Sequence, residues 1–178
     1  LKAFQAASSI SSRRRLFGRT GTTNLDGLLG GIKWGGAAGQ GDALTFSFAY
    51  YGGAAATFAS GIPEAQGQLR YGFNDVQAQA ARSALAAWAS VANLSFREVA
   101  ETASGNTVGD LRFAYSSGDM DSDTWGQAYF PSASPEGGDV WLSALSSSAN
   151  STDPTDWLPG TFDHESLIHE LGHALGLK

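Results

Sequence analysis

Two histidines and a glutamate in the last ten residues of the printed sequence have the spacing of a metal site. His169 and His173 are four residues apart, and Glu170 directly follows the first histidine. In a helix, residues four apart lie one turn apart on one face, so both imidazoles can reach one ion about 2 Å from each nitrogen. We therefore predict that His169 and His173 bind zinc.

Glu170 is expected to lie beside such a metal rather than on it, because it is the immediate neighbour of the first histidine. Zinc lowers the pKa of its bound water to about 7. A carboxylate at this place can accept the proton of that water and later pass it to a leaving amine. The pattern predicts peptide-bond hydrolysis without a covalent intermediate, with Glu170 as the general base.

A catalytic zinc ion needs three protein ligands and one open position. The other histidine, His164, is about 140° away from the shared face of a regular helix, so we expect it to hydrogen-bond near the helix start instead. A bare H-E-x-x-H also occurs by chance as a surface feature. Here residues 169–176 match the start of the longer pattern H-E-x-x-H-x-x-G-x-x-H, whose third histidine would be the residue after Lys178.

The helix that carries these residues is predicted to run from His164 to about Leu175. Asp163 is the expected N-cap, and Gly176 is the expected stop. The helix also has an apolar face, which would anchor it in a core and hold the ligands rigidly.

A second helix and several short strands are expected to hold the ligand helix in place. Residues 74–91 have apolar side chains at three- and four-residue intervals, and Asn74 with Gln77 resembles a capping box. Alternating side chains predict three strands, and two further segments are expected to be short or edge strands. These five segments are residues 44–50, 94–99, 111–115, 126–131 and 139–142.

The composition excludes several kinds of function. The 178 residues include 42% hydrophobic side chains, enough for one core of ordinary size. A formal charge of −6 argues against nucleic acid or an anionic membrane surface as the main partner. Cysteine is absent, so any metal must be held by histidine, carboxylate, carbonyl or water ligands. Neither a secretory signal nor a membrane-spanning stretch is visible.

The chain divides into two parts by composition. Residues 1–24 are rich in Ser, Thr, Arg and Gly without periodicity, so we expect a flexible or propeptide-like leader there. Residues 25–178 are expected to form part of a single domain. No internal repeat is visible, and in particular there is no glycine-aspartate nonapeptide array of the calcium-binding kind.

An acidic loop offers a weaker candidate metal site. Asp119, Asp121 and Asp123 occupy alternate positions, a spacing that calcium sites use. Thr124 stands where an EF-hand needs glycine, and Phe130 stands where it needs glutamate, so an EF-hand is excluded. A simple calcium loop and a solvated acidic loop both remain open.

Several blocks of the chain, taken in order, resemble the serralysin branch of the metzincins, which are secreted bacterial zinc endopeptidases. The blocks are residues 26–34, 44–48, 77–99 and 126–129 and the H-E-x-x-H segment. They cover nearly the whole chain after residue 24. The resemblance implies an α+β metzincin-type protease domain, with a twisted mixed sheet of about five strands, a long backing helix and an active-site helix.

The resemblance also implies how a substrate binds. Ala128, Tyr129 and Phe130 would belong to an edge strand that pairs with extended polypeptide above the cleft, in addition to the zinc and catalytic roles given above. Polypeptide substrates and the remaining part of the same protease are the expected partners. Calcium-binding repeats and a signal for extracellular release by a type I route would follow Lys178. The alternative is a catalytically incomplete N-terminal fragment that serves as a structural partner of that remaining part or of an inhibitor.

Overall fold

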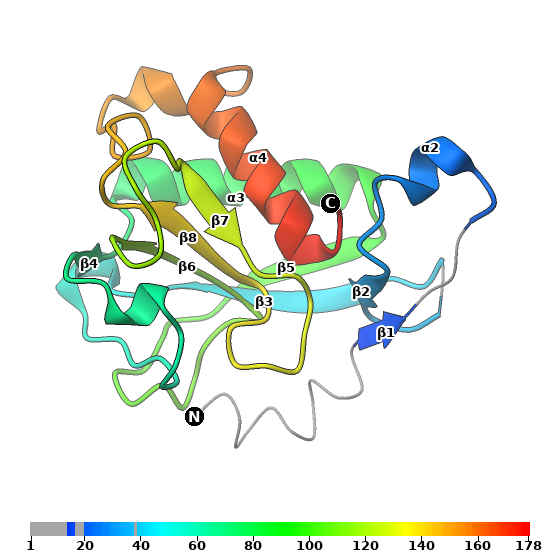
Figure 1. Ribbon diagram of the computed structural model, residues 1–178, viewed down its shortest axis with the longest axis horizontal. Coiled ribbons are helices and arrows are strands. Elements are labelled where there is room, and N and C mark those ends of the chain that lie inside the picture. Colours follow the sequence, from blue (N-terminus) through cyan, green and yellow to red (C-terminus); the bar gives the residue numbers. More distant parts are fainter. Residues whose placement is uncertain (1–13, 17–19, 38) are drawn as a thin grey trace.

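The computed structural model describes residues 14–16, 20–37 and 39–178. In this part of the chain, two long helices lie on one face of a mixed β-sheet (Figure 1). The helices are α2 (Thr23–Asp26), α3 (Asp75–Val91) and α4 (Phe162–Leu175), with short 3-10 turns η1 (Tyr51–Gly53), η2 (Glu64–Gln66) and η3 (Pro154–Trp157). The strands are β1 (Arg14–Leu16), β2 (Ile32–Trp34), β3 (Asp42–Phe48), β4 (Arg70–Tyr71), β5 (Leu94–Glu98), β6 (Leu111–Ser116), β7 (Gly126–Ala128) and β8 (Asp139–Ser143).

The main sheet has the order β5-β3-β6-β8-β7, and β4 pairs with the far end of β6. Strands β5, β3, β6 and β8 are parallel, whereas β7 runs antiparallel to β8 and β4 antiparallel to β6. The predicted mixed sheet is therefore confirmed, with six strands instead of about five. The expectation that residues 139–142 form a short or edge strand is wrong in one respect, because β8 lies between β6 and β7 and is buried throughout.

Helix α3 follows its local sequence signals closely. The Asn74 side chain accepts a hydrogen bond from the Gln77 backbone N–H, and the Gln77 side chain accepts one from the Asn74 N–H, each at 2.9 Å. This reciprocal pair is the predicted capping box. One face of the helix then buries small side chains and Leu85 against the sheet, so α3 forms the back of the core on which α4 rests.

Helix α4 begins earlier than predicted. Its N-cap is Thr161, and Asp163 lies inside the first turn. The Asp163 carboxylate accepts hydrogen bonds from the Trp125 indole N–H at 2.8 Å and from the Ser148 hydroxyl, so it joins α4 to two loops instead of capping the helix. The predicted stop is confirmed, since Gly176 has a φ of 110° and donates to the carbonyls of the last turn.

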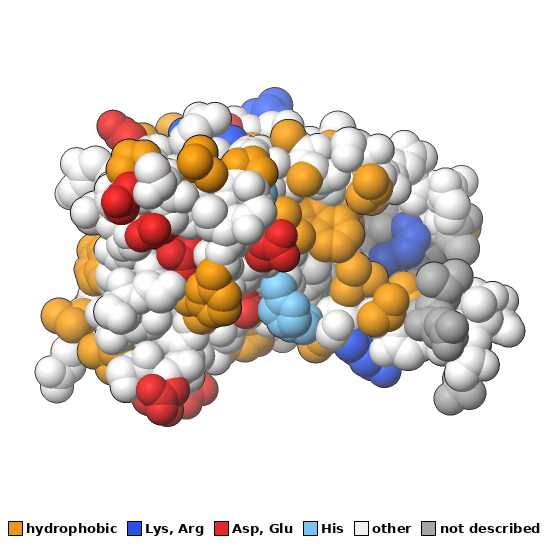
Figure 2. Space-filling view, turned by 90° about the horizontal axis from the view of Figure 1, so that it is seen from above, with side chains coloured by type: hydrophobic (Ala, Val, Ile, Leu, Met, Phe, Trp, Pro, Cys, Tyr) orange, Lys and Arg blue, Asp and Glu red, His pale blue; other side chains and the backbone are white. Residues whose placement is uncertain are grey.

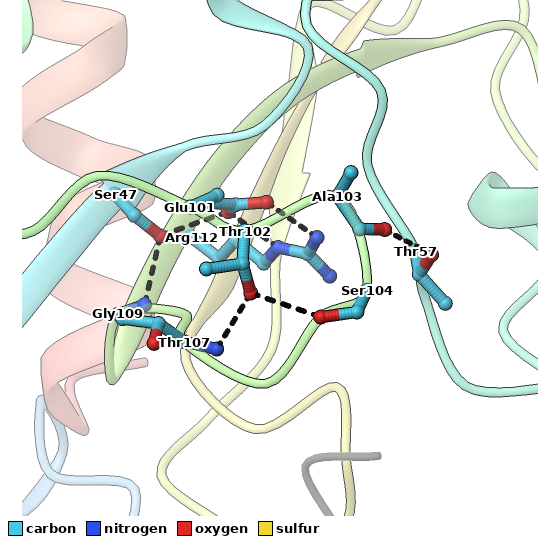
Figure 3. A network of polar contacts seen from close by, with 9 residues as sticks. All are labelled: Ser47, Thr57, Glu101, Thr102, Ala103, Ser104, Thr107, Gly109 and Arg112. Atoms are coloured by element: carbon cyan, nitrogen blue, oxygen red, sulfur yellow. Dashed lines mark hydrogen bonds and ion pairs between the residues drawn. The ribbon is translucent and has the colours of Figure 1, made fainter.

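The two faces of the main sheet have different chemistry, because side chains alternate between them along each strand. On the helix side, aromatic and aliphatic residues of β3, β6 and β8 form the larger hydrophobic core. The opposite face holds a smaller apolar cluster together with buried polar and charged groups. Among these groups are Arg112 and Glu101, whose hydrogen-bond network joins the segment after β5 to the sheet (Figure 3).

The structure describes part of the segment expected to be a flexible leader. Arg14–Leu16 form β1, which pairs antiparallel with β2 in a small separate sheet. Residues 1–13 and 17–19 lie outside the described residues, so the prediction for them is untested. Among the described residues, no helix combines the length and the apolar character needed to cross a membrane.

Candidate metal centre

The two histidines of α4 face one another across one helical turn. Their Nε2 atoms are 3.0 Å apart, and the ring centroids are 4.5 Å apart. Two nitrogens in a tetrahedral zinc site with ordinary bond lengths are separated by about 3.3 Å. The donor set and its spacing in His169 and His173 therefore fit a shared zinc ion.

A backbone carbonyl fixes the orientation of the second ligand. The Nδ1 atom of His173 lies 2.9 Å from the carbonyl oxygen of Leu177, just beyond the Gly176 turn. A carbonyl can only accept, so Nδ1 carries the proton in this contact and leaves the Nε2 lone pair for a metal. The stop of the helix is thus part of the site, because it places Leu177 where its carbonyl meets His173.

Glu170 lies in the narrow space between α4 and the edge of the sheet. Its side chain is buried, and a side-chain carbon placed on Gly126 of β7 would stand 3.5 Å from its Cγ atom. Burial raises the pKa of Glu170, and the nearby His173 opposes part of this rise. A carboxyl with a raised pKa accepts a proton more readily near neutral pH, as a general base requires.

An open pocket of about 460 Å³ adjoins this group on the side of the helix start. It is lined by Trp125, Thr161, Phe162, Glu165, His169 and Glu170, among others. From above, histidine side chains are exposed between acidic and hydrophobic side chains on this face (Figure 2).

The predicted substrate segment is only partly available to a substrate. Among the described residues, β7 is the last strand of the sheet, as an edge strand should be, but it ends at Ala128. The Tyr129 N–H still donates to the Asp139 carbonyl at 2.9 Å, while the Tyr129 hydroxyl is bound inside the protein. Phe130 is 41% exposed, and its ring centroid lies 5.8 Å from that of His173. Substrate binding by residues 128–130 stays a prediction. The groups available for it are the backbone of β7 and the ring of Phe130.

The segment 28–34 holds the C-terminal end of α4, which sequence reasoning did not foresee. The Trp34 indole N–H donates to the Ala174 carbonyl at 2.8 Å. The Gly30 N–H donates to the Gly176 carbonyl, and the Lys178 N–H donates to the Leu28 carbonyl, both at 2.8 Å. These contacts join residues 140 to 150 positions apart, so no local sequence pattern predicts them.

His164 takes no part in the histidine pair. It is buried against α3, with its Nε2 atom 3.4 Å from the Ser83 hydroxyl. Burial lowers its pKa, and the charge of Glu165 opposes this effect. The hydrogen bond expected for His164 near the start of α4 is therefore made to Ser83 of the neighbouring helix α3.

The three aspartates of the acidic loop do not converge. The Asp121 carboxylate accepts from the Asp123 N–H, the Thr124 N–H and the Thr124 hydroxyl at 2.8–3.0 Å, and these bonds lower its pKa. Among residues 14–16, 20–37 and 39–178, no group of three or more His, Cys, Asp or Glu side chains is arranged to hold a metal ion. Within this part of the chain, the histidine pair of α4 therefore has no third ligand of these types.

Helix α4 thus carries two converging histidines and an adjacent buried glutamate, and it is set against the edge strand β7. Serralysin A from Dickeya chrysanthemi is similar to the chain, with 34% identity over 106 residues, which are 60% of this chain and 21% of that protein. Serralysin from Proteus mirabilis is 31% identical over 147 residues, or 78% and 28% of the two chains. The metalloprotease AprA from Pseudomonas entomophila is 34% identical over 109 residues, or 60% and 20%.

These relatives support the expected resemblance to serralysins, and the similarity extends over 60–78% of the chain. No protein-family model matches it. The chain spans about a fifth to a quarter of the length of the curated relatives it matches.

Proposed function

We propose that the chain is the N-terminal part of the catalytic domain of a zinc-dependent endopeptidase of the serralysin branch of the metzincins. One observation carries this proposal. The Nε2 atoms of His169 and His173 are 3.0 Å apart on one face of α4, with Glu170 buried beside them. The similarity to serralysins supports the same reading.

In this proposal the ligands are His169, His173 and a third group from outside the described residues. Bound zinc would polarise the scissile carbonyl and lower the pKa of a water molecule. The Glu170 carboxylate would accept a proton from this water as the water oxygen adds to the carbonyl carbon, and would return the proton to the amine nitrogen as the C–N bond breaks. The free edge of β7 aligns the substrate backbone in extended form above α4.

The proposed setting follows from the relatives. We propose extracellular release by a bacterial type I route, with polypeptide substrates and the remaining part of the same protease as partners. Calcium is a second proposed cofactor. These statements depend on the serralysin-like character of the chain.

Glu170→Gln tests the proposal directly. The variant should keep about one zinc ion per protein, because it leaves both histidines intact. It should lose casein cleavage by about 100-fold to 10,000-fold, the usual contribution of a general base. Zinc content, intact mass and casein cleavage are measured on the full-length protein. Cleavage at the wild-type rate in Glu170→Gln contradicts the assignment.

A structural role is the second candidate function. Two histidines converge on α4, and among the described residues no group of three His, Cys, Asp or Glu side chains could hold a metal ion. The 178-residue chain by itself would then be a structural partner of the rest of the protease or of an inhibitor. Zinc binding and casein cleavage by the isolated chain would argue against this alternative.

A further inference from the structure

Glu64 is a buried carboxylate beneath the edge of the sheet to which the zinc chemistry gives no role. It begins η2, far from α4 in sequence, and its side chain is fully buried. Its Oε1 atom accepts hydrogen bonds from the Gln127 amide and from the Tyr129 hydroxyl, the latter at 2.8 Å, and Oε2 lies 3.0 Å from the same hydroxyl. Both donors belong to β7 or to the residue just after it.

These donors lie on one face of β7, and Glu170 lies against the other. Gln127 and Tyr129 alternate with Gly126 and Ala128 along the strand, so the two pairs point in opposite directions. Ala128 packs into the helix-side core, and Gly126 faces the Glu170 side chain. The predicted substrate strand is therefore held between α4 on one side and Glu64 on the other.

The strand has few other restraints. It is three residues long, and in the described part of the chain its backbone pairs only with β8. Glu64 itself is fixed, because its backbone carbonyl accepts a hydrogen bond of 2.5 Å from the Ser116 hydroxyl at the end of β6. Glu64 thus connects β7 to the centre of the sheet.

A buried carboxylate is a costly way to fill this space. Desolvation of the charge must be offset by hydrogen bonds or by an ion pair. Among the described residues, the ion pairs are Arg82–Glu98 and Arg112–Glu101, and Glu64 takes part in neither. Its compensation comes from the two donors of the β7 segment, so a shift of that segment would leave the carboxylate unsatisfied.

We propose that Glu64 is a positioning residue for the substrate strand β7. Its carboxylate fixes the position of β7, so that an extended polypeptide can pair with this strand beside Glu170. This inference rests on the proposed function. Glu64 touches neither the substrate nor the metal site. Its loss should weaken substrate binding and leave the chemistry at Glu170 intact.

The test compares Glu64→Ala, Glu64→Gln and Glu101→Gln in the zinc-loaded, full-length protein. Glu101 is the matched control, because its carboxylate is also buried on this face but is bound to Arg112 and not to β7. We expect Glu64→Ala to raise the KM for a peptide substrate by about tenfold and to change kcat less than twofold, as loss of uniform binding does. Glu64→Gln should have a KM much closer to the wild-type value than Glu64→Ala has, and Glu101→Gln should leave the KM unchanged.

Tyr129→Phe guards against a Glu64→Ala variant that does not fold, since it removes one donor and keeps the ring. It should raise KM by a smaller factor and speed amide hydrogen exchange in residues 126–129 but not in α4. An unchanged KM and exchange rate in the Glu64 and Tyr129 variants overturns the inference, as does an equal rise of KM in Glu101→Gln. A zinc-loaded wild-type protein that cleaves no peptide overturns the proposed function instead.

Discussion

The two faces of the sheet are stabilised by different means. On the helix side, apolar side chains such as Phe113 and Leu171 pack with no polar partner to satisfy. On the opposite face, the buried charges of Glu64, Arg112 and Glu101 each depend on a specific partner. The helix side therefore sets the overall fold and carries α4, whereas the opposite face fixes loops and the edge strand at defined places. The helix side should tolerate substitutions that conserve side-chain volume, whereas the opposite face should not tolerate the loss of a hydrogen-bond or ion-pair partner.

Arg112→Ala should have the largest effect on stability. Arg112 makes two hydrogen bonds of 2.6 Å to Glu101, and its guanidinium lies 3.4 Å from the centre of the Phe58 ring. Removing it leaves a buried carboxylate without its cation, which costs about 3–5 kcal/mol. Urea unfolding monitored by tryptophan fluorescence measures the change.

Two matched variants sharpen this result. Arg82→Ala breaks an ion pair whose side chains are 32% and 40% exposed, so it should cost less than about 1 kcal/mol. Replacing both Arg112 and Glu101 by apolar residues of similar volume should recover much of the loss, because no charge is left unpaired. Equal costs for Arg112→Ala and Arg82→Ala would remove the distinction between buried and exposed pairs.

Leu171→Ala probes the helix side at the ligand helix. Leu171 directly follows the predicted catalytic residue in the sequence and is fully buried in the helix-side core. Truncation should destabilise the protein by about 2–5 kcal/mol through lost burial and the cavity left behind. Leu171→Met should cost less than about 1.5 kcal/mol, because it conserves volume. Thermal unfolding compares them, and a methionine variant as unstable as the alanine variant would contradict the expected tolerance of this face.

The sequence predicted what local pattern encodes. The capping box of α3, the position of Gly176 and the convergence of His169 and His173 each follow from residues within one or two turns. The start of α4 was wrong because the Asp163 carboxylate has partners outside its own helix, in Trp125 and Ser148. The Asp163 carboxylate could cap the helix or accept hydrogen bonds from distant segments, and the local sequence does not show which of the two occurs.

Contacts between distant segments were not predictable from one sequence. Glu64 and Tyr129 are 65 positions apart, and nothing near Glu64 suggests a buried carboxylate. The interior place of β8 depends on strand order, which a strand pattern alone does not fix. The missed features lie at α4 as well as on the sheet face without helices, and in each case a specific partner comes from a distant segment.

The pH dependence of stability offers the smallest and most selective test of the helix side. Burial lowers the pKa of His164 below its ordinary value of 6.5, so the folded protein favours the neutral ring. The unfolded chain then binds a proton at higher pH than the folded one. The resulting stability is fully present above pH 6.5 and is lost as the pH falls toward the folded pKa.

Glu170 makes the unfolding free energy depend on pH with the opposite sign, so the comparison uses proteins that lack this carboxyl group. Its raised pKa gives stability that is present below the ordinary value of 4.5 and is lost as the pH rises through the folded pKa. Unfolding free energies between pH 5 and 8 are therefore compared in Glu170→Gln and in Glu170→Gln with His164→Gln, both without metal. The first protein should lose stability on acidification, and the added His164→Gln should flatten that loss. A slope unaffected by His164→Gln would show that protonation of this buried ring does not limit the packing of α4 on α3.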